Sequence, residues 1–192
     1  MKNTVPFCLL ALPLFFLTTA RAQQQTLKIE PQSSVVAFSL GDVLHQVHGT
    51  FHIQSGTVEF DPSASKIGGG VVVAAGSGKS GNDTRDRKMT TEILDAAHFA
   101  EVSFAPRSYQ GAISPSGDSK IQVTGVFTLH GASHELTVPM EIHIEGTNCT
   151  VKTHFAVPYV KWGLKDPSTF ILRVSKEVEI DLTLVGALTR PS

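Results

Sequence analysis

The sequence predicts an all-β domain, either an antiparallel sandwich or a closed antiparallel barrel, with one short helical insertion. Three observations favour this class: runs of alternating apolar and polar residues, turn-forming residues between the runs, and no long helical patterns between them. Alternation with a period of two places the apolar side chains of a strand on one face. Closure into a barrel would remove the exposed edges of such a sheet.

About eight strands are expected from this pattern. In the clearest run, residues 136–145, every second side chain from Leu136 to Ile144 is apolar. The expected strands lie within residues 34–40, 46–53, 56–61, 67–75, 101–111, 121–129, 136–145, 151–159 and 174–184. Stretches rich in glycine, proline, serine and asparagine separate the longer runs, as turns require.

Residues 82–97 depart from the strand pattern. Asn82 is a capping-type residue, and Met89 and Ile93 stand four positions apart, which places them on one helical face. We expect one or two short helices here, inserted between strands and lying over one end of the barrel.

The N-terminus has the order of a secretory signal peptide. Lys2 precedes an apolar run from Val5 to Leu17, and Ala20-Arg21-Ala22 follows as a small-x-small cleavage site. We expect a signal peptide of residues 1–22, a domain of residues 23–192 and a periplasmic or secreted location. No later segment has the length of a membrane span.

The charge of the expected mature chain gives no reason to predict nucleic acid as a partner. Removal of Lys2 and Arg21 leaves 14 of the 16 basic residues against 17 acidic ones, a net charge of −3. Binding to a phosphate backbone depends on an excess of basic side chains, which is missing here.

Histidines are the main candidates for catalytic chemistry, because imidazoles that lie close together ligate zinc or copper. They are His45, His48, His52, His130, His134, His143 and His154. His48 and His52 fall on the strand face opposite Val47 and Phe51, which is the expected solvent face. A metal-dependent enzyme therefore remains an alternative. We nevertheless expect no metal site and no catalytic residue, because no G-x-S-x-G motif occurs and Cys149 is a lone thiol without an evident base.

Two polar blocks are candidates for ligand contact. In residues 81–86, Arg85 is placed either to bind a headgroup or to pair with Asp83 or Asp86. Residues 158–167 include Trp162, and they either line the mouth of a pocket or form a plug that caps the core.

The order of several short motifs resembles the YceI-like family. The motifs include Val47-His48-Gly49-Thr50-Phe51, Gly81-Asn82-x-x-Arg85-Asp86-x-x-Met89, Phe99-x-x-Val102-Ser103-Phe104 and Leu136-Thr137-Val138-Pro139. The resemblance covers residues 27–186. It implies an extended, lipocalin-like eight-stranded antiparallel barrel with a short helical insertion, exported from the cytoplasm and without assigned catalytic residues. It also implies a polyisoprenoid or another long-chain amphiphile inside the barrel.

We therefore expect an exported lipid-binding protein that is not an enzyme and has no cofactor other than its bound lipid. The expected apolar wall comprises Phe38, Phe51, Phe60, Phe104, Phe127, Met140, Phe155 and Trp162. Arg85, Lys161 and Lys165 are the expected headgroup residues, and a homodimer is an open possibility. A barrel filled by its own side chains, acting as a structural or stress-related module, is a further alternative.

Overall fold

The computed structural model of the protein describes residues 24–41, 46–169 and 173–190. The predicted signal peptide, residues 1–22, and the predicted candidate ligand His45 both lie outside these ranges.

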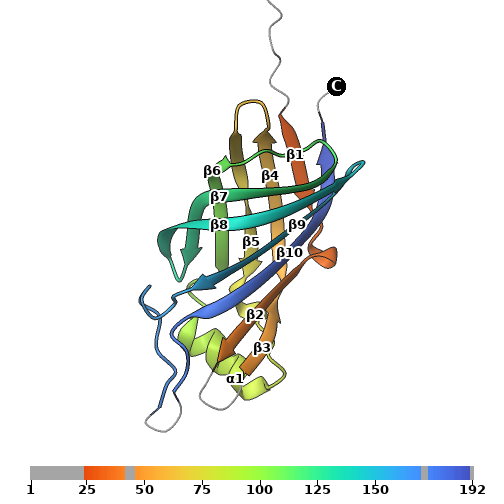
Figure 1. Ribbon diagram of the computed structural model, residues 1–192. Coiled ribbons are helices and arrows are strands. Elements are labelled where there is room, and N and C mark those ends of the chain that lie inside the picture. The colour runs from red at the N-terminus through yellow and green to blue at the C-terminus, as the bar shows by residue number, and fades with distance from the viewer. Residues whose placement is uncertain (1–23, 42–45, 170–172, 191–192) are drawn as a thin grey trace, which may run out of the picture.

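Within the described residues, ten strands form one sheet in which every pairing is antiparallel (Figure 1). The strands are β1 (Gln25–Ile29), β2 (Val35–Gly41), β3 (Gln46–Phe51), β4 (Ile53–Asp61), β5 (Lys66–Ala74), β6 (Glu101–Gln110), β7 (Gly117–Leu129), β8 (Ala132–Glu145), β9 (Asn148–Val157) and β10 (Val178–Thr189).

The ten strands occupy eight positions around a closed barrel. The order β1-β4-β5-β6-β7-β8-β9-β10 returns to its start, because β1 pairs with both β4 and β10. Strands β1 and β2 lie along different parts of the same neighbour, β10, and the turn η1 (Pro31–Ser33) separates them. Strand β3 pairs with β2 and runs into β4 with one residue between them. The predicted eight-stranded antiparallel barrel is therefore confirmed, and the sandwich is excluded.

Close backbone approach lets the barrel close between β1 and β10. Ile29 pairs with Gly186, and a side chain on Gly186 would collide with the backbone carbonyl oxygen of Lys28. Glycine is the residue that allows two backbones to approach in this way.

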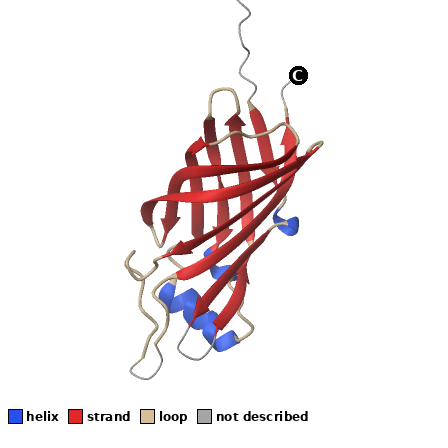
Figure 2. Ribbon diagram, viewed as in Figure 1, coloured by secondary structure: helices blue, strands red, loops and turns tan. Residues whose placement is uncertain are grey.

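The helical insertion lies at one end of the barrel, the lower end in Figure 2. After the short turn η2 (Ala75–Ser77) it consists of α1 (Asp83–Lys88) and one π-helical turn, η3 (Met89–Ile93). The Asn82 side chain accepts a hydrogen bond of 3.0 Å from the backbone N–H of Arg85, which caps the first turn. The predicted insertion is confirmed.

The two ends of the barrel differ in packing. Ile144, Val123 and Val138 are the largest fully buried side chains, and they belong to the main hydrophobic cluster with residues of β1, β4, β7, β8 and β10. A second cluster lies near the helical end, where Val157, Tyr159 and neighbouring side chains pack with Ile93 and Leu94 of the insertion. None of the helices in the described residues has the length and hydrophobicity that a membrane crossing requires.

Candidate ligand-binding cavity

A cavity of about 650 Å³ lies inside the barrel. Alternate side chains of the strands form most of its wall, as the period of two requires. Along β9, Val151, Thr153 and Phe155 line the cavity, whereas Lys152 and His154 are exposed on the outer face. The wall is therefore almost entirely apolar.

Seven of the eight side chains that were expected to form the apolar wall lie in it: Phe38, Phe51, Phe60, Phe104, Phe127, Met140 and Phe155. The rings of Phe38 and Phe51 are 5.3 Å apart between centroids, and those of Phe127 and Phe155 are 6.2 Å apart in an edge-on arrangement. Such pairs present continuous apolar surface to the interior. A volume of this size contradicts the alternative of a barrel filled by its own side chains.

Trp162, the eighth expected wall residue, does not line the cavity. Its ring stacks on His134, with centroids 4.1 Å apart and planes within 4°, and it lies 5.7 Å from the ring of Phe127. Two other residues of the same loop, Tyr159 and Leu164, are buried and do line the cavity. The loop therefore closes part of the wall, and its tryptophan packs behind that wall.

The two expected headgroup lysines also lie outside the wall. Lys161 and Lys165 are both exposed, and neither lines the cavity. The Lys165 Nζ lies 2.8 Å from Glu92 Oε2 on η3, and this contact lowers the pKa of Glu92. Lys165 thus joins the loop to the helical insertion instead of reaching the interior.

Arg85 does line the cavity, at its helical end. Its guanidinium donates from Nε to Ser80 Oγ and from Nη2 to the Ser80 carbonyl oxygen, both at 2.8 Å. These bonds use two of the five N–H donors of an arginine. The predicted alternative was a pairing of Arg85 with Asp83 or Asp86. No hydrogen bond or ion pair joins them among the described residues, although the charge of Arg85 helps to lower the pKa of Asp86.

Asp86 fixes the residue that positions Arg85. The Oδ1 atom of this buried carboxylate accepts hydrogen bonds from the Ser80 hydroxyl and, at 2.8 Å, from the Ser80 backbone N–H. The Ser80 hydroxyl bond is the main reason why the pKa of Asp86 lies below its usual value. The carboxylate therefore stays ionised and anchors Ser80, and through Ser80 the guanidinium.

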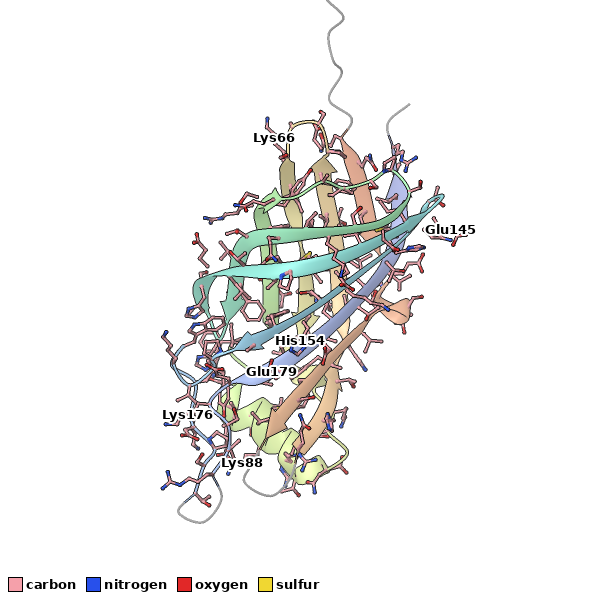
Figure 3. The ribbon with its side chains drawn as sticks, viewed as in Figure 1. Lys66, Lys88, Glu145, His154, Lys176 and Glu179 are labelled. Atoms are coloured by element: carbon pink, nitrogen blue, oxygen red, sulfur yellow. The ribbon has the colours of Figure 1, made fainter. Side chains whose placement is uncertain are left out.

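Lys88 is a wall residue that the sequence reasoning missed. It lies at the helical end of the barrel (Figure 3) and lines the cavity with Arg85. Its spacing from Arg85 could have identified it, because residues three positions apart share a helical face. Among the described residues of the wall, Arg85 and Lys88 are the only charged ones, and both are cationic.

The thiol of Cys149 also lies in the wall, and burial raises its pKa to about 11. At pH 8 only about 0.1% of the thiol is then in the reactive thiolate form. In a chain of residues 23–192, where Cys149 is the single cysteine, we expect iodoacetamide to alkylate the folded protein at least about a hundredfold more slowly than the urea-unfolded protein. Mass spectrometry of timed samples measures both rates, and similar rates would contradict this placement of Cys149.

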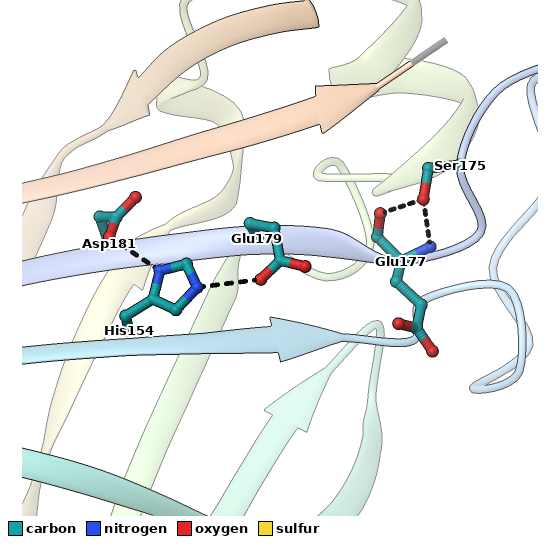
Figure 4. A network of polar contacts seen from close by, with 5 residues as sticks. All are labelled: His154, Ser175, Glu177, Glu179 and Asp181. Carbon is teal, nitrogen blue, oxygen red and sulfur yellow. Dashed lines mark hydrogen bonds and ion pairs between the residues drawn. The ribbon is translucent and has the colours of Figure 1, made fainter. Parts of the chain in front are cut away.

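The described histidines lie outside the cavity wall. His130 and His134 contact the aromatic rings of Phe99 and Trp162, and the buried Nε2 atom of His134 has no hydrogen-bond partner among the described residues. His154 has Asp181 Oδ1 2.8 Å from Nδ1 and Glu179 Oε2 3.3 Å from Nε2, all on the outer face of β9 and β10 (Figure 4). The Nδ1 atom of His48 lies 2.9 Å from Ser39 Oγ, and the Nδ1 atom of His143 lies 2.7 Å from Asp118 Oδ1. In the part of the chain that the structure describes, no three side chains of histidine, cysteine, aspartate or glutamate are grouped so that they could bind a metal ion.

A closed eight-stranded antiparallel barrel with an apolar cavity and a helical insertion at one end defines a lipocalin-like class of β-barrel protein. The model of the YceI-like domain matches residues 27–186, and the chain belongs to the YceI-like family. This membership confirms the resemblance seen in the sequence motifs.

Similar proteins occur in several bacteria. A UPF0312 protein of Pseudomonas savastanoi pv. phaseolicola is 28% identical over 151 residues, which cover 76% of each chain. The crystal structure of BcnA from Burkholderia cenocepacia matches with a TM-score of 0.67 at 20% identity, covering 82% of this chain and 99% of BcnA. A polyisoprenoid binding domain from Saccharophagus degradans matches with a TM-score of 0.63 at 14% identity, covering 86% of this chain and 98% of that domain. At these identities the two structural matches support the fold.

Proposed function

We propose that the protein is a non-enzymatic carrier, exported to the periplasm or secreted, which binds a polyisoprenoid or another long-chain amphiphile inside its barrel. The observation that carries this proposal is the apolar cavity of about 650 Å³ with two cationic side chains at one end. An apolar chain would occupy the barrel, and an anionic headgroup would lie at Arg85 and Lys88.

The size of the cavity is adequate for such a chain. One water molecule occupies about 30 Å³ of liquid, so the cavity has the volume of roughly twenty groups of that size. Burial of each methylene stabilises a complex by about 0.8 kcal/mol. A dozen buried carbons therefore contribute roughly 10 kcal/mol before the cost of ordering the ligand, which is enough for tight binding.

The family supports the same class of ligand. The structural neighbour from Saccharophagus degradans is a polyisoprenoid binding domain. The metal-dependent enzyme is the weaker alternative, because His48, His143 and His154 contact a hydroxyl or carboxylates on the outer face and no group of three potential metal ligands is found among the described residues.

The experiment that tests the proposal is a titration of delipidated mature protein with octadecanoic acid and with a long-chain isoprenoid alcohol, followed by calorimetry. We expect saturable binding of one chain per barrel. No binding of either probe at any concentration below its solubility limit would rule the proposal out.

Arg85→Gln and Lys88→Gln are each expected to weaken binding of octadecanoic acid by roughly three- to tenfold, because a charge-assisted hydrogen bond to the carboxylate is lost. The alcohol of the same chain length has no negative charge, and its affinity should stay within about twofold. Arg87→Gln is the matched control, since Arg87 is on the same helix and does not line the cavity. Equal losses of affinity for the acid and the alcohol would contradict a headgroup site at Arg85 and Lys88.

A further inference from the structure

Different parts of the chain lie at the two ends of the cavity. The cationic residues of α1 line the helical end. Strand β6 begins beside this end, because Glu101 pairs with Ala74, the last residue before η2. The strand ends at Gln110, so the loop of residues 111–116 that follows it lies at the opposite end of the barrel, the upper end in Figure 1.

Ile113 is the one residue of this loop that lines the cavity. Its side chain is half-buried and packs against the main hydrophobic cluster. The neighbouring wall includes Phe60 and Ile67, which pair with each other beside the turn between β4 and β5. Because Ile113 lines the cavity and is still partly exposed, its side chain stands between the far end of the cavity and the solvent.

The loop is anchored to β7 on both sides of Ile113. Gly111 has a φ of +110°, and a Cβ atom there would lie 2.9 Å from the carbonyl oxygen of Lys120, so only glycine lets the loop pack this closely on the strand. The backbone N–H of Ser114 donates a hydrogen bond of 2.9 Å to Oγ of Ser119, which is buried. These contacts hold the Ile113 side chain in one place over the end of the cavity.

The distance between the two ends limits the length of a chain that lies inside. On β5, the wall residues Val73 and Ile67 stand at the helical end and at the far end, six positions apart. Six positions correspond to about 20 Å along a strand. A zigzag hydrocarbon chain advances about 1.25 Å per carbon, so about sixteen carbons cover this length. The cavity volume gives a similar limit of roughly twenty carbon-sized groups.

We propose that Ile113 is the stop that sets the longest chain the barrel accepts. A chain whose headgroup lies at Arg85 and Lys88 ends against the Ile113 side chain. This inference rests on the proposed function and narrows the ligand class to amphiphiles with about sixteen to twenty carbons between headgroup and chain end. The limit applies to a fatty chain and to the main chain of an isoprenoid alike. A shorter chain leaves apolar wall uncovered, and a longer chain has to fold back or displace Ile113.

The test is a series of straight-chain acids from decanoic to docosanoic acid, each competed against a fluorescent fatty acid on delipidated protein. For the native chain we expect affinity to rise roughly fourfold per methylene up to the limit. Beyond about sixteen to twenty carbons the affinity should level off or fall, because further methylenes find no apolar wall to cover.

The two variants of Ile113 should move this limit in opposite directions. Ile113→Ala opens the far end, so the limit should move to longer acids by at least about two carbons. Ile113→Trp places a ring in the path of the chain, so the limit should move to shorter acids by about four carbons. Dodecanoic acid is too short to reach Ile113, and both variants should bind it within about twofold of the native affinity. Ala112→Trp is the matched control, because Ala112 is exposed and does not line the cavity.

Circular dichroism checks that each variant is folded. The same limit in the native chain, Ile113→Ala and Ile113→Trp, or no limit across the native series, would overturn the role of Ile113. Equal losses of dodecanoic and octadecanoic acid in folded Ile113→Trp would also overturn it, because a stop acts only on chains that reach it. In each of these cases binding of octadecanoic acid would still support the lipid carrier. Failure of every acid to bind the native chain would instead overturn the proposed function, and the stop with it.

Discussion

Leu182→Trp is expected to lower the affinity for octadecanoic acid by about a hundredfold while the barrel stays folded. Leu182 is half-buried, lies in the middle of β10 and lines the cavity. A tryptophan ring at this position would occupy the path of the chain. Displacement of about four methylenes costs roughly 3 kcal/mol, which corresponds to this loss in affinity.

The fold should tolerate this change because the ring enters existing space. Overpacking destabilises a filled core by about 1–3 kcal/mol, whereas filling a cavity is often neutral or stabilising. Thr183→Trp is the control, since Thr183 is the next residue of β10 and does not line the cavity. Calorimetry measures binding and circular dichroism measures folding. Native affinity in folded Leu182→Trp would contradict binding inside the barrel.

Ile144→Ala is expected to have the largest effect on stability, with a loss of about 2–5 kcal/mol in the free energy of unfolding. Ile144 is 2% exposed, belongs to the main hydrophobic cluster and does not line the cavity. Its removal would create a new void in a packed region. Urea unfolding of the delipidated protein measures the change.

Leu182→Ala is the matched comparison, because it removes a side chain of similar size from the cavity wall. That side chain already lacks packing atoms on its cavity side, so its removal forfeits fewer contacts. We expect a cost of about 1–2 kcal/mol, below that of Ile144→Ala. Equal costs for the two variants would contradict a hollow barrel interior at Leu182.

Most of the barrel could be predicted from the sequence because a wet outer face and an apolar inner face produce strict alternation. The strand β1 was missed, although it closes the barrel against β4 and β10. It has only five residues and directly follows the expected signal peptide, so its two apolar side chains make a weak pattern. The predicted start of the last strand at residue 174 was also too early, because β10 begins at Val178.

The apolar wall could be predicted for the same reason, since strand parity determines which side chains point inward. The polar residues that contact the ligand could not be predicted in this way, because the geometry of a loop is not periodic. Lys161, Trp162 and Lys165 stand together in the sequence, yet Lys165 pairs with Glu92 and Trp162 stacks on His134. Lys88 and Thr153 could have been predicted as wall residues from spacing alone. Lys88 shares a helical face with Arg85, and Thr153 lies between the wall residues Val151 and Phe155 on β9.

Native mass spectrometry of the protein, purified from its own host without organic solvent, is the most direct test of lipid binding inside the barrel. We expect a species heavier than the bare polypeptide by the mass of one amphiphile. Solvent extraction should release that amphiphile, and Leu182→Trp should lack it. A bare polypeptide mass for the native chain, together with no uptake of any long-chain probe, would contradict binding of an amphiphile inside the barrel.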